Sequence, residues 1–257
     1  MNPEDLSGLI DADQGQEAPV IRLSAAVMAH PKRTEMVESL LAELDRPVPV
    51  VWDQCNDRHE TGLRALLAAD PDATHHLVIQ DDAVPCGDLL AGMEAALAHV
   101  PAGHPACFYV GRVRPFRQLI DAAVRLAGDE ASWLRMPGPY WGPAIVVPTA
   151  DVPALATWWH GAGRRIPNYD RRIARFYAAR GLNCYYSWPS LVDHRGDVSL
   201  IGHGTSQRRA HRALKAGQSA LEVGWSGPVV EVRGAERADA RRDRDAARAS
   251  RARLVRG

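Results

Sequence analysis

The chain lacks the features that mark secreted, membrane-spanning and strongly basic proteins. Its four cysteines are widely spaced and form neither a paired metal-ligand motif nor a disulfide framework, which favours a reducing compartment. The formal net charge is zero, so no global field attracts nucleic acid or a membrane. No apolar run approaches the roughly 18–20 residues that span a bilayer. We therefore expect a cytoplasmic protein without a membrane span.

The two ends of the chain differ from the rest. Residues 1–19 are acidic, with no basic residue before Arg22, which is the opposite of a secretory signal, and we expect a partly disordered leader. Residues 233–257 hold nine arginines against four acidic residues, a net +5. Because these acids are interleaved with the arginines, the pattern favours a flexible, solvated helical tail. Residues 20–232 are long enough to bury one substantial core.

Strands and helices alternate through residues 20–111. The β-rich runs are residues 21–28, 48–52, 76–80 and 106–110. The helical patterns between them are residues 32–44, 61–69 and 89–100. Such alternation implies parallel strands joined by right-handed crossovers.

The second half, residues 112–232, is less regular. It predicts helices at residues 116–127, 152–159 and 169–179, and strands at residues 144–147 and 184–187. Asp151 is a plausible cap for the second of these helices, and Gly181 is the expected stop of the third. The whole pattern predicts an α/β fold with a mostly parallel open sheet flanked by helices.

A pair of acidic residues, Asp81 and Asp82, follows the strand at residues 76–80. The next residues, Ala83-Val84-Pro85 and Gly87, predict that the strand stops there. Ligands of parallel α/β sheets bind beyond the carboxyl ends of the strands. Carboxylates are hard oxygen donors that suit Mg²⁺ or Mn²⁺ and, through the metal, a diphosphate. Asp is also common in turns, so the pair by itself fits a plain strand end as well.

Polar residues also follow the two earlier strands. His30 and Arg33 come after the first strand and border the same crevice, where they can contact a base or a phosphate. Arg33 also fits the solvent face of the following helix. Asp53 follows the second strand, where its carboxylate can accept hydrogen bonds from a ribose or a base imide, or form a turn.

The order of these features resembles the nucleotide-sugar glycosyltransferases of the GT-A fold, most closely their bacterial and phage members, over about residues 21–203. The segment Tyr140 to Pro148 looks like the acceptor-side strand, and Pro167-Asn168-Tyr169-Asp170 is similar to the acidic motif beside the acceptor hydroxyl. Pro189 to His194 looks like the late segment that often returns a His to the metal. The resemblance implies a GT-A-like, Rossmann-like domain, with a nucleotide-sugar-binding half at residues 20–111 and an acceptor half at residues 112–232.

The resemblance also implies roles for single residues around a Mn²⁺ or Mg²⁺ ion. Asp82 is the expected direct ligand, and Asp81 binds through water or contacts the ribose. His194 is a further candidate ligand, since imidazole suits Mn²⁺. His203, flanked by two glycines, is a candidate for a loop over the phosphates.

Two residues of the second half are candidates for the acceptor side. Asp170 opens a helix, where the helix dipole favours a carboxylate, and it is our candidate general base for the acceptor hydroxyl. Trp141, after a Pro-Gly-Pro turn, is the expected wall for a sugar or an acceptor.

These features predict a metal-dependent glycosyltransferase of the hexosyltransferase type. It would move a sugar from a nucleotide sugar, with a UDP-sugar favoured, to a hydroxyl of a glycan, a protein or a modified DNA base. A nucleotidyltransferase of the same fold is an alternative, but Ala29-His30-Pro31 lacks the glycine-rich phosphate loop of such enzymes. A nucleic-acid-binding protein acting through the Arg-rich tail is a second alternative, which the zero net charge disfavours.

Overall fold

A computed structural model of the chain describes residues 20–114, 116–127, 130–166, 168–195, 209–238, 240–241 and 244. The acidic leader, His203 and most of the Arg-rich tail lie outside the described residues. The leader, the tail and the division of the domain into two halves therefore stay predictions.

Strands and helices alternate along the chain, as the sequence predicts. The strands are β1 (Leu23–Ala29), β2 (Val50–Trp52), β3 (His75–Gln80), β4 (Ala83–Pro85), β5 (Ala106–Cys107), β6 (Trp133–Met136), β7 (Ala144–Pro148), β8 (Cys184–Ser187), β9 (Val192–His194) and β10 (Val229–Glu231). The α-helices are α1 (Thr34–Glu43), α2 (Arg58–Leu67), α3 (Leu89–Leu97), α4 (Phe116–Ala127), α5 (Val152–His160) and α6 (Tyr169–Ala179). Short 3₁₀ helices are η2 (Pro31–Arg33), η3 (Thr149–Asp151), η4 (Ala162–Arg165) and η6 (Ala220–Glu222).

A large mixed sheet runs through the molecule in the order β10-β6-β8-β5-β7-β3-β1-β2. Strand β1 pairs in parallel with both β2 and β3, β5 pairs in parallel with β8, and β10 pairs in parallel with β6. Strand β7 is antiparallel to β3 and to β5, and β6 is antiparallel to β8. The predicted α/β class with a mostly parallel sheet is confirmed.

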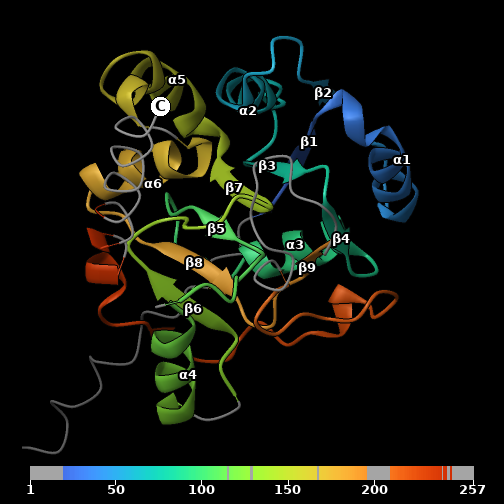
Figure 1. Cartoon of the computed structure of the whole chain (residues 1–257). Helices are drawn as coiled ribbons and strands as arrows, with labels where there is room; N and C mark the ends of the chain where they lie inside the picture. Colours follow the sequence, from blue (N-terminus) through green and yellow to red (C-terminus); the bar gives the residue numbers. More distant parts are fainter. Residues whose placement is uncertain are drawn as a thin grey trace, which may run out of the picture.

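Helices cover both faces of this sheet. One core cluster joins α2, α4, α5 and α6 to one face through residues such as Leu66, Ile120 and Tyr177. The other cluster joins α1 and α3 to the opposite face through Leu40 and Met93. Figure 1 shows α1 and α2 near β2 and α4 near β6, toward the other end of the sheet. Buried neighbours on β3 point to opposite faces, as strand geometry requires, so two helix layers enclose the sheet.

Several helices and strands begin or end at residues other than those predicted, because local hydrogen bonds determine where they begin and end. Helix α2 begins at Arg58 rather than Thr61, because the Asp57 side chain accepts from the backbone N–H groups of His59 and Glu60. Helix α1 begins at Thr34 rather than at residue 32, because residues 31–33 form the 3₁₀ turn η2. The predicted strand at residues 106–110 is shorter, ending at Cys107.

The predicted end of the strand at Gln80 is confirmed, but Ala83 to Pro85 form a further strand that was not predicted. These residues form β4, which pairs antiparallel with β9 and places Ala83 opposite His194. The sequence also predicts no strand at β6, β9 or β10. These strands have three or four residues, so their formation depends on partners that are distant in sequence.

The two predicted helix-terminal residues differ in outcome. Asp151 precedes α5 as expected, but its carboxylate does not cap the helix. It accepts instead from the Tyr177 hydroxyl at 3.0 Å and from Arg180 at 2.8 Å, which ties α5 to α6. Gly181 follows α6 with φ +70°, a left-handed conformation that glycine adopts without strain, so this predicted stop is confirmed.

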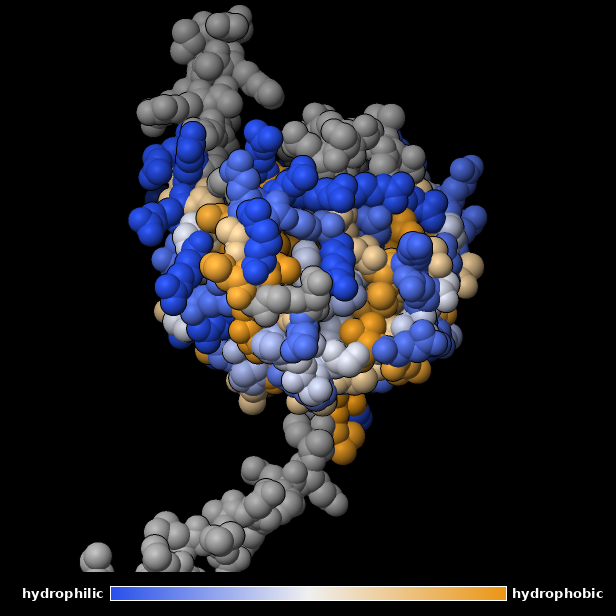
Figure 2. Space-filling model, turned by 90° about the horizontal axis from the view of Figure 1, so that it is seen from below, coloured by the Kyte–Doolittle hydropathy of each residue, from blue (hydrophilic) through white to orange (hydrophobic). Residues whose placement is uncertain are grey.

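The surface is mixed in character. On the face seen from below, hydrophilic residues cover much of the area and apolar residues lie between them (Figure 2). Among the described residues, no helix has both the length and the apolar composition that crossing a bilayer requires.

Helix α3 and η6 pack closely at Gly92. A methyl group at this position would overlap the Cβ of Ala220, which is fully buried. We expect Gly92→Ala to lower the free energy of unfolding by about 1–3 kcal/mol, because overpacking outweighs the gain in helix propensity. Chemical denaturation measures this. Gly224→Ala is the matched control, since no heavy atom outside its chain neighbours lies near that position; equal stability of the two variants would contradict the packing.

Candidate functional site

The carboxyl edge of the parallel strands brings the predicted strand-end residues together. In the register of the sheet, Ala29 lies opposite Trp52 and Met28 opposite Gln80. The backbone N–H of Asp53 donates to the carbonyl of Ala29 at 2.7 Å, and that of Asp81 donates to Met28 at 3.1 Å. The residues that follow β1, β2 and β3 are therefore neighbours.

Arg33 joins the two carboxylates of the acidic pair. Its Nη1 lies 2.6 Å from Oδ1 of Asp81 and 2.6 Å from Oδ2 of Asp82. The backbone N–H of His30 donates to the other oxygen of Asp81 at 2.8 Å. Asp81 and Asp82 are only 5% and 6% exposed, so this is a buried cluster rather than a solvated turn.

The pairing of β4 with β9 brings His194 to the same cluster. The backbone N–H of Arg195 donates to the carbonyl of Asp82 at 2.9 Å. The Nδ1 of His194 lies 2.7 Å from the Arg195 carbonyl, to which it donates, and the Nε2 lies 3.4 Å from Oδ2 of Asp82. A carbonyl on Nδ1 fixes the ring so that Nε2 faces the carboxylate.

Burial and charge oppose each other in this cluster. Burial raises the pKa of Asp81, and the neighbouring Asp82 raises it further, whereas Arg33 and the His30 hydrogen bond lower it; the net direction is upward. For Arg33, burial acts to lower the pKa, but the attraction of Asp82 and Asp81 outweighs it and the pKa is raised. The guanidinium therefore stays charged, and it is the cation that offsets the two carboxylates.

This edge offers one carboxylate and one imidazole, which are ligand types that suit a divalent cation. Oδ2 of Asp82 and Nε2 of His194 converge, and carboxylate with imidazole suits Mn²⁺. Within the described residues, no group of three or more His, Cys, Asp or Glu side chains is placed to hold a metal ion. Cations on nucleotide phosphates often take only one or two protein ligands, with phosphate and water completing the shell.

Asp53 follows β2 and lies beside the end of β1. Oδ1 of Asp53 accepts from the backbone N–H groups of Cys55 and Asp57, each at 3.1 Å. The carboxylate thus shapes the loop that leads to α2 and remains half-buried beside the carboxyl end of β1.

Tyr169, at the start of α6, packs close to Gly142, which also lies beside Gln80 at the end of β3. The Tyr169 hydroxyl donates to the carbonyl of Gly142, and the ring packs near Gly62 of α2. Burial raises the pKa of Tyr169 well above its usual value, and the charges of Asp170 and of Asp82 add to this rise. The two carboxylates that the sequence assigns to different halves therefore act on one buried hydroxyl.

Trp141 is less open than expected. Its ring is 7% exposed and contacts Tyr109, Phe116, Tyr140 and Tyr186, mostly edge to face. The ring is a buried member of the aromatic core that supports this edge of the sheet, which leaves little of its surface for stacking on a sugar.

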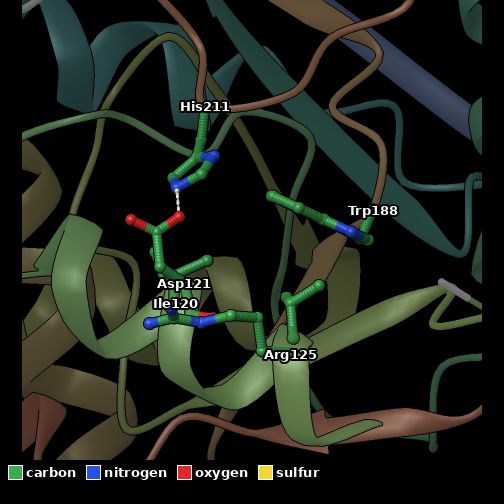
Figure 3. Close-up of a pocket in the computed structure, with 6 residues that line it drawn as sticks. Ile120, Asp121, Arg125, Trp188 and His211 are labelled. Carbon is green, nitrogen blue, oxygen red and sulfur yellow. Dashed lines mark hydrogen bonds and ion pairs between the residues drawn. The ribbon is translucent and has the colours of Figure 1, made fainter. Parts of the chain in front are cut away.

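A separate pocket lies beside α4. It has a volume of about 250 Å³ and is lined by Ile120, Asp121, Val124, Arg125, Trp188 and His211. Nε2 of His211 lies 2.8 Å from Oδ1 of Asp121, so the imidazole and the carboxylate face each other in the pocket (Figure 3). None of the predicted site residues lines this pocket.

Sequence reasoning missed two parts of the site. It did not assign Tyr169 a role, although the residue lies next to Asp170 in the quoted motif. It left Arg33 between two alternatives and did not predict the contact with the acidic pair. His203 lies outside the described residues, so its position stays a prediction.

Comparisons with known proteins give only distant similarities. No protein-family model matches the sequence, and no curated protein matches it. One similar solved structure is Drosophila β-1,4-galactosyltransferase 7, a mutant in complex with manganese, UDP-Gal and xylobiose; it has 9% identity and a TM-score of 0.36, covering 81% of this chain and 93% of that chain. Another is a glycosyltransferase involved in glycosylation of the major capsid of PBCV-1, with 11% identity and a TM-score of 0.30, covering 64% of this chain and 80% of that chain.

Tyr169 generates a prediction about alkaline stability. The folded protein holds the Tyr169 proton, whereas the unfolded chain releases it near pH 10, so the stability that depends on this proton is complete below pH 10 and falls above it. In Tyr169→Phe we expect a loss of about 1 kcal/mol at pH 7 from the missing hydrogen bond. Above pH 10, the free energy of unfolding of Tyr169→Phe should fall less steeply with pH than that of the wild type, by at most about 1.4 kcal/mol per pH unit. Denaturant unfolding at several pH values measures both, and an unchanged alkaline slope would contradict the burial of this hydroxyl.

Proposed function

We propose that the chain is a metal-dependent glycosyltransferase that moves a sugar from a nucleotide-diphosphate sugar, with a UDP-sugar favoured, to an acceptor hydroxyl. The observation that carries this proposal is the convergence of Asp81, Asp82, His194 and Arg33 beyond the carboxyl ends of β1 and β3. Ligands of α/β sheets bind at this edge. The cluster offers a carboxylate and an imidazole to a divalent cation and a guanidinium to a diphosphate.

Each residue on the donor side has one proposed role. Asp82 and His194 are the proposed ligands of Mn²⁺ or Mg²⁺, and Asp81 holds Arg33 and lies near the ribose. The bound cation would offset negative charge on the departing diphosphate, worth several kcal/mol in a water-poor site. His30 and Arg33 border the base and the phosphates. Asp53, whose Oδ1 holds its own loop, keeps Oδ2 for a ribose hydroxyl.

The acceptor side depends on Asp170. We propose that its carboxylate takes the proton from the acceptor hydroxyl as the new sugar bond forms. Its half-buried position in the first turn of α6, next to Tyr169, supports this role. Trp141 would support the acceptor wall from the core, and His203 would cover the phosphates. A hexose as the sugar, a glycan, protein or modified base as the acceptor, and a phage-like, cytoplasmic setting complete the proposal.

A thermal-shift experiment with nucleotides tests the donor class. We expect uridine diphosphate or a UDP-sugar with Mn²⁺ to raise the melting temperature. A ligand at about 100 times its dissociation constant adds about 2.7 kcal/mol of apparent stability. For a domain of this size that corresponds to a rise of about 5–10 °C. If no nucleotide changes the melting temperature with or without Mn²⁺, the proposed function is wrong.

Two variants separate the proposed metal ligand from the proposed base. Asp82→Ala should weaken metal-dependent donor binding and abolish transfer together, since it removes a ligand that acts on both the bound complex and the leaving group. Asp170→Asn should leave donor binding nearly intact while turnover falls by about 10²–10⁴, the range for a lost general base. Calorimetry of donor binding and a transfer assay measure the two effects.

The control for both variants is Asp72→Ala, an exposed residue before the amino end of β3, at the opposite edge of the sheet from the acidic pair. It should change neither binding nor turnover. Loss of donor binding in Asp170→Asn as severe as in Asp82→Ala would move Asp170 into the donor site. Unchanged metal dependence in Asp82→Ala would exclude it as a ligand.

A further inference from the structure

A divalent cation placed between Asp82 and His194 would share one carboxylate oxygen with Arg33. Oδ2 of Asp82 accepts from Nη1 of Arg33 at 2.6 Å and is also the oxygen that Nε2 of His194 faces at 3.4 Å. A cation bound by Asp82 and His194 would lie between these two atoms. Because a guanidinium and a divalent cation on one oxygen repel each other, close binding of one weakens the binding of the other.

Either Arg33 or a divalent cation can offset the negative charge of Asp82. Asp81 and Asp82 are both buried and adjacent, so their carboxylates repel each other unless a cation lies between them. Arg33 meets this need, with its side chain only 11% exposed and bonded to both carboxylates. A divalent cation on Asp82 would meet the same need for that carboxylate.

The backbone of Arg33 allows its side chain to move while the turn stays in place. The turn η2 is fixed by Arg33 N–H donating to the His30 carbonyl at 2.9 Å and by Lys32 N–H donating to Nδ1 of His30 at 3.1 Å. Neither bond involves the guanidinium. The side chain can therefore leave Asp82 by rotation about its own bonds, and a diphosphate at this edge is an anion that a guanidinium binds well.

We propose that Arg33 is the resident counter-ion of the acidic pair and must leave Asp82 before a divalent cation binds. The inference rests on the proposed function, and it adds a regulatory step: the metal site opens when the guanidinium transfers to the diphosphate of the incoming nucleotide. Without nucleotide, Arg33 holds Asp82 and weakens metal binding. Nucleotide and metal thereby promote each other's binding, as linkage requires.

A purely structural ion pair would behave differently. If Arg33 only stabilised the fold, its removal would lower stability and leave the affinity for a metal unchanged or reduced. If Arg33 competes with the metal, its removal raises that affinity even when no nucleotide is present. The affinity of the protein for Mn²⁺ alone therefore separates the two roles.

Calorimetric titration of the full chain with Mn²⁺ alone is the test. Arg33→Gln should bind Mn²⁺ at least about tenfold more tightly than the wild type, within the usual range of coupling between sites. Arg195→Gln is the matched control, because it removes a positive charge next to His194 whose guanidinium donates to Ser39 at 2.5 Å rather than to the pair. It should change the affinity by less than about threefold, the small effect of a partly exposed charge.

A second measurement observes the Arg33 side chain of the wild-type chain directly. The ¹⁵N NMR signal of the Arg33 guanidinium should shift when Mg²⁺ and uridine diphosphate are added together; it is assigned by its absence from Arg33→Lys spectra. A guanidinium signal that stays unchanged while both ligands bind would overturn the inference.

The outcomes distinguish this inference from the proposed function. Tighter Mn²⁺ binding in Arg33→Gln, with Arg195→Gln unchanged, supports the displacement of Arg33. Equal or weaker binding in Arg33→Gln, with Mn²⁺ still binding in the presence of uridine diphosphate, overturns the inference and leaves the proposed function standing. An absence of Mn²⁺ binding in every variant, with and without nucleotide, overturns both.

Discussion

Two adjacent carboxylates buried at the edge of a sheet need a cation beside them, and the arrangement of the site follows from that need. Asp81 and Asp82 are almost fully buried, and the charge of Asp82 contributes to the raised pKa of Asp81. Arg33 supplies the cation and is held by both. The short turn η2, directly after β1, is what places its side chain within reach of the end of β3.

The same constraint explains the irregular strands near the site. The β4–β9 pair is short, yet it places His194 opposite Ala83 and so beside Asp82. Asp193, the residue before His194, accepts from the backbone N–H of Ala210 and from Arg209, which joins the later segment of the chain to β9. The imidazole thus has a position that is fixed by backbone pairing on one side and by a side-chain anchor on the other.

The sequence predicted the features that depend on local pattern. Alternating apolar runs gave the α/β class, and parallel strands share an edge, so the meeting of His30, Asp53 and Asp81 followed from their order. The contact between Arg33 and the acidic pair did not follow. Helical periodicity alone left Arg33 free to face solvent, and the observed direction depends on the 3₁₀ turn and on two buried charges.

Features that depend on partners distant in the sequence could not be predicted from local sequence patterns either. The antiparallel insertion of β7 between β3 and β5 is set by pairing across the sheet rather than by its own residues. The Trp141 ring looked suitable for an open wall after a Pro-Gly-Pro turn, but rings such as Phe116 and Tyr186, from separate elements, enclose it. Enclosure of this kind is a property of packing and cannot be read from a local motif.

The central claim is that Asp82 and His194 hold a divalent cation at the carboxyl edge of β1 and β3. A crystal structure with Mn²⁺ and uridine diphosphate, using anomalous scattering to locate manganese, tests it most directly. The account predicts a manganese peak about 2.2 Å from an Asp82 carboxylate oxygen and from Nε2 of His194, with the Arg33 guanidinium on the diphosphate. Manganese bound elsewhere, with Arg33 still joining Asp81 and Asp82, would contradict the account.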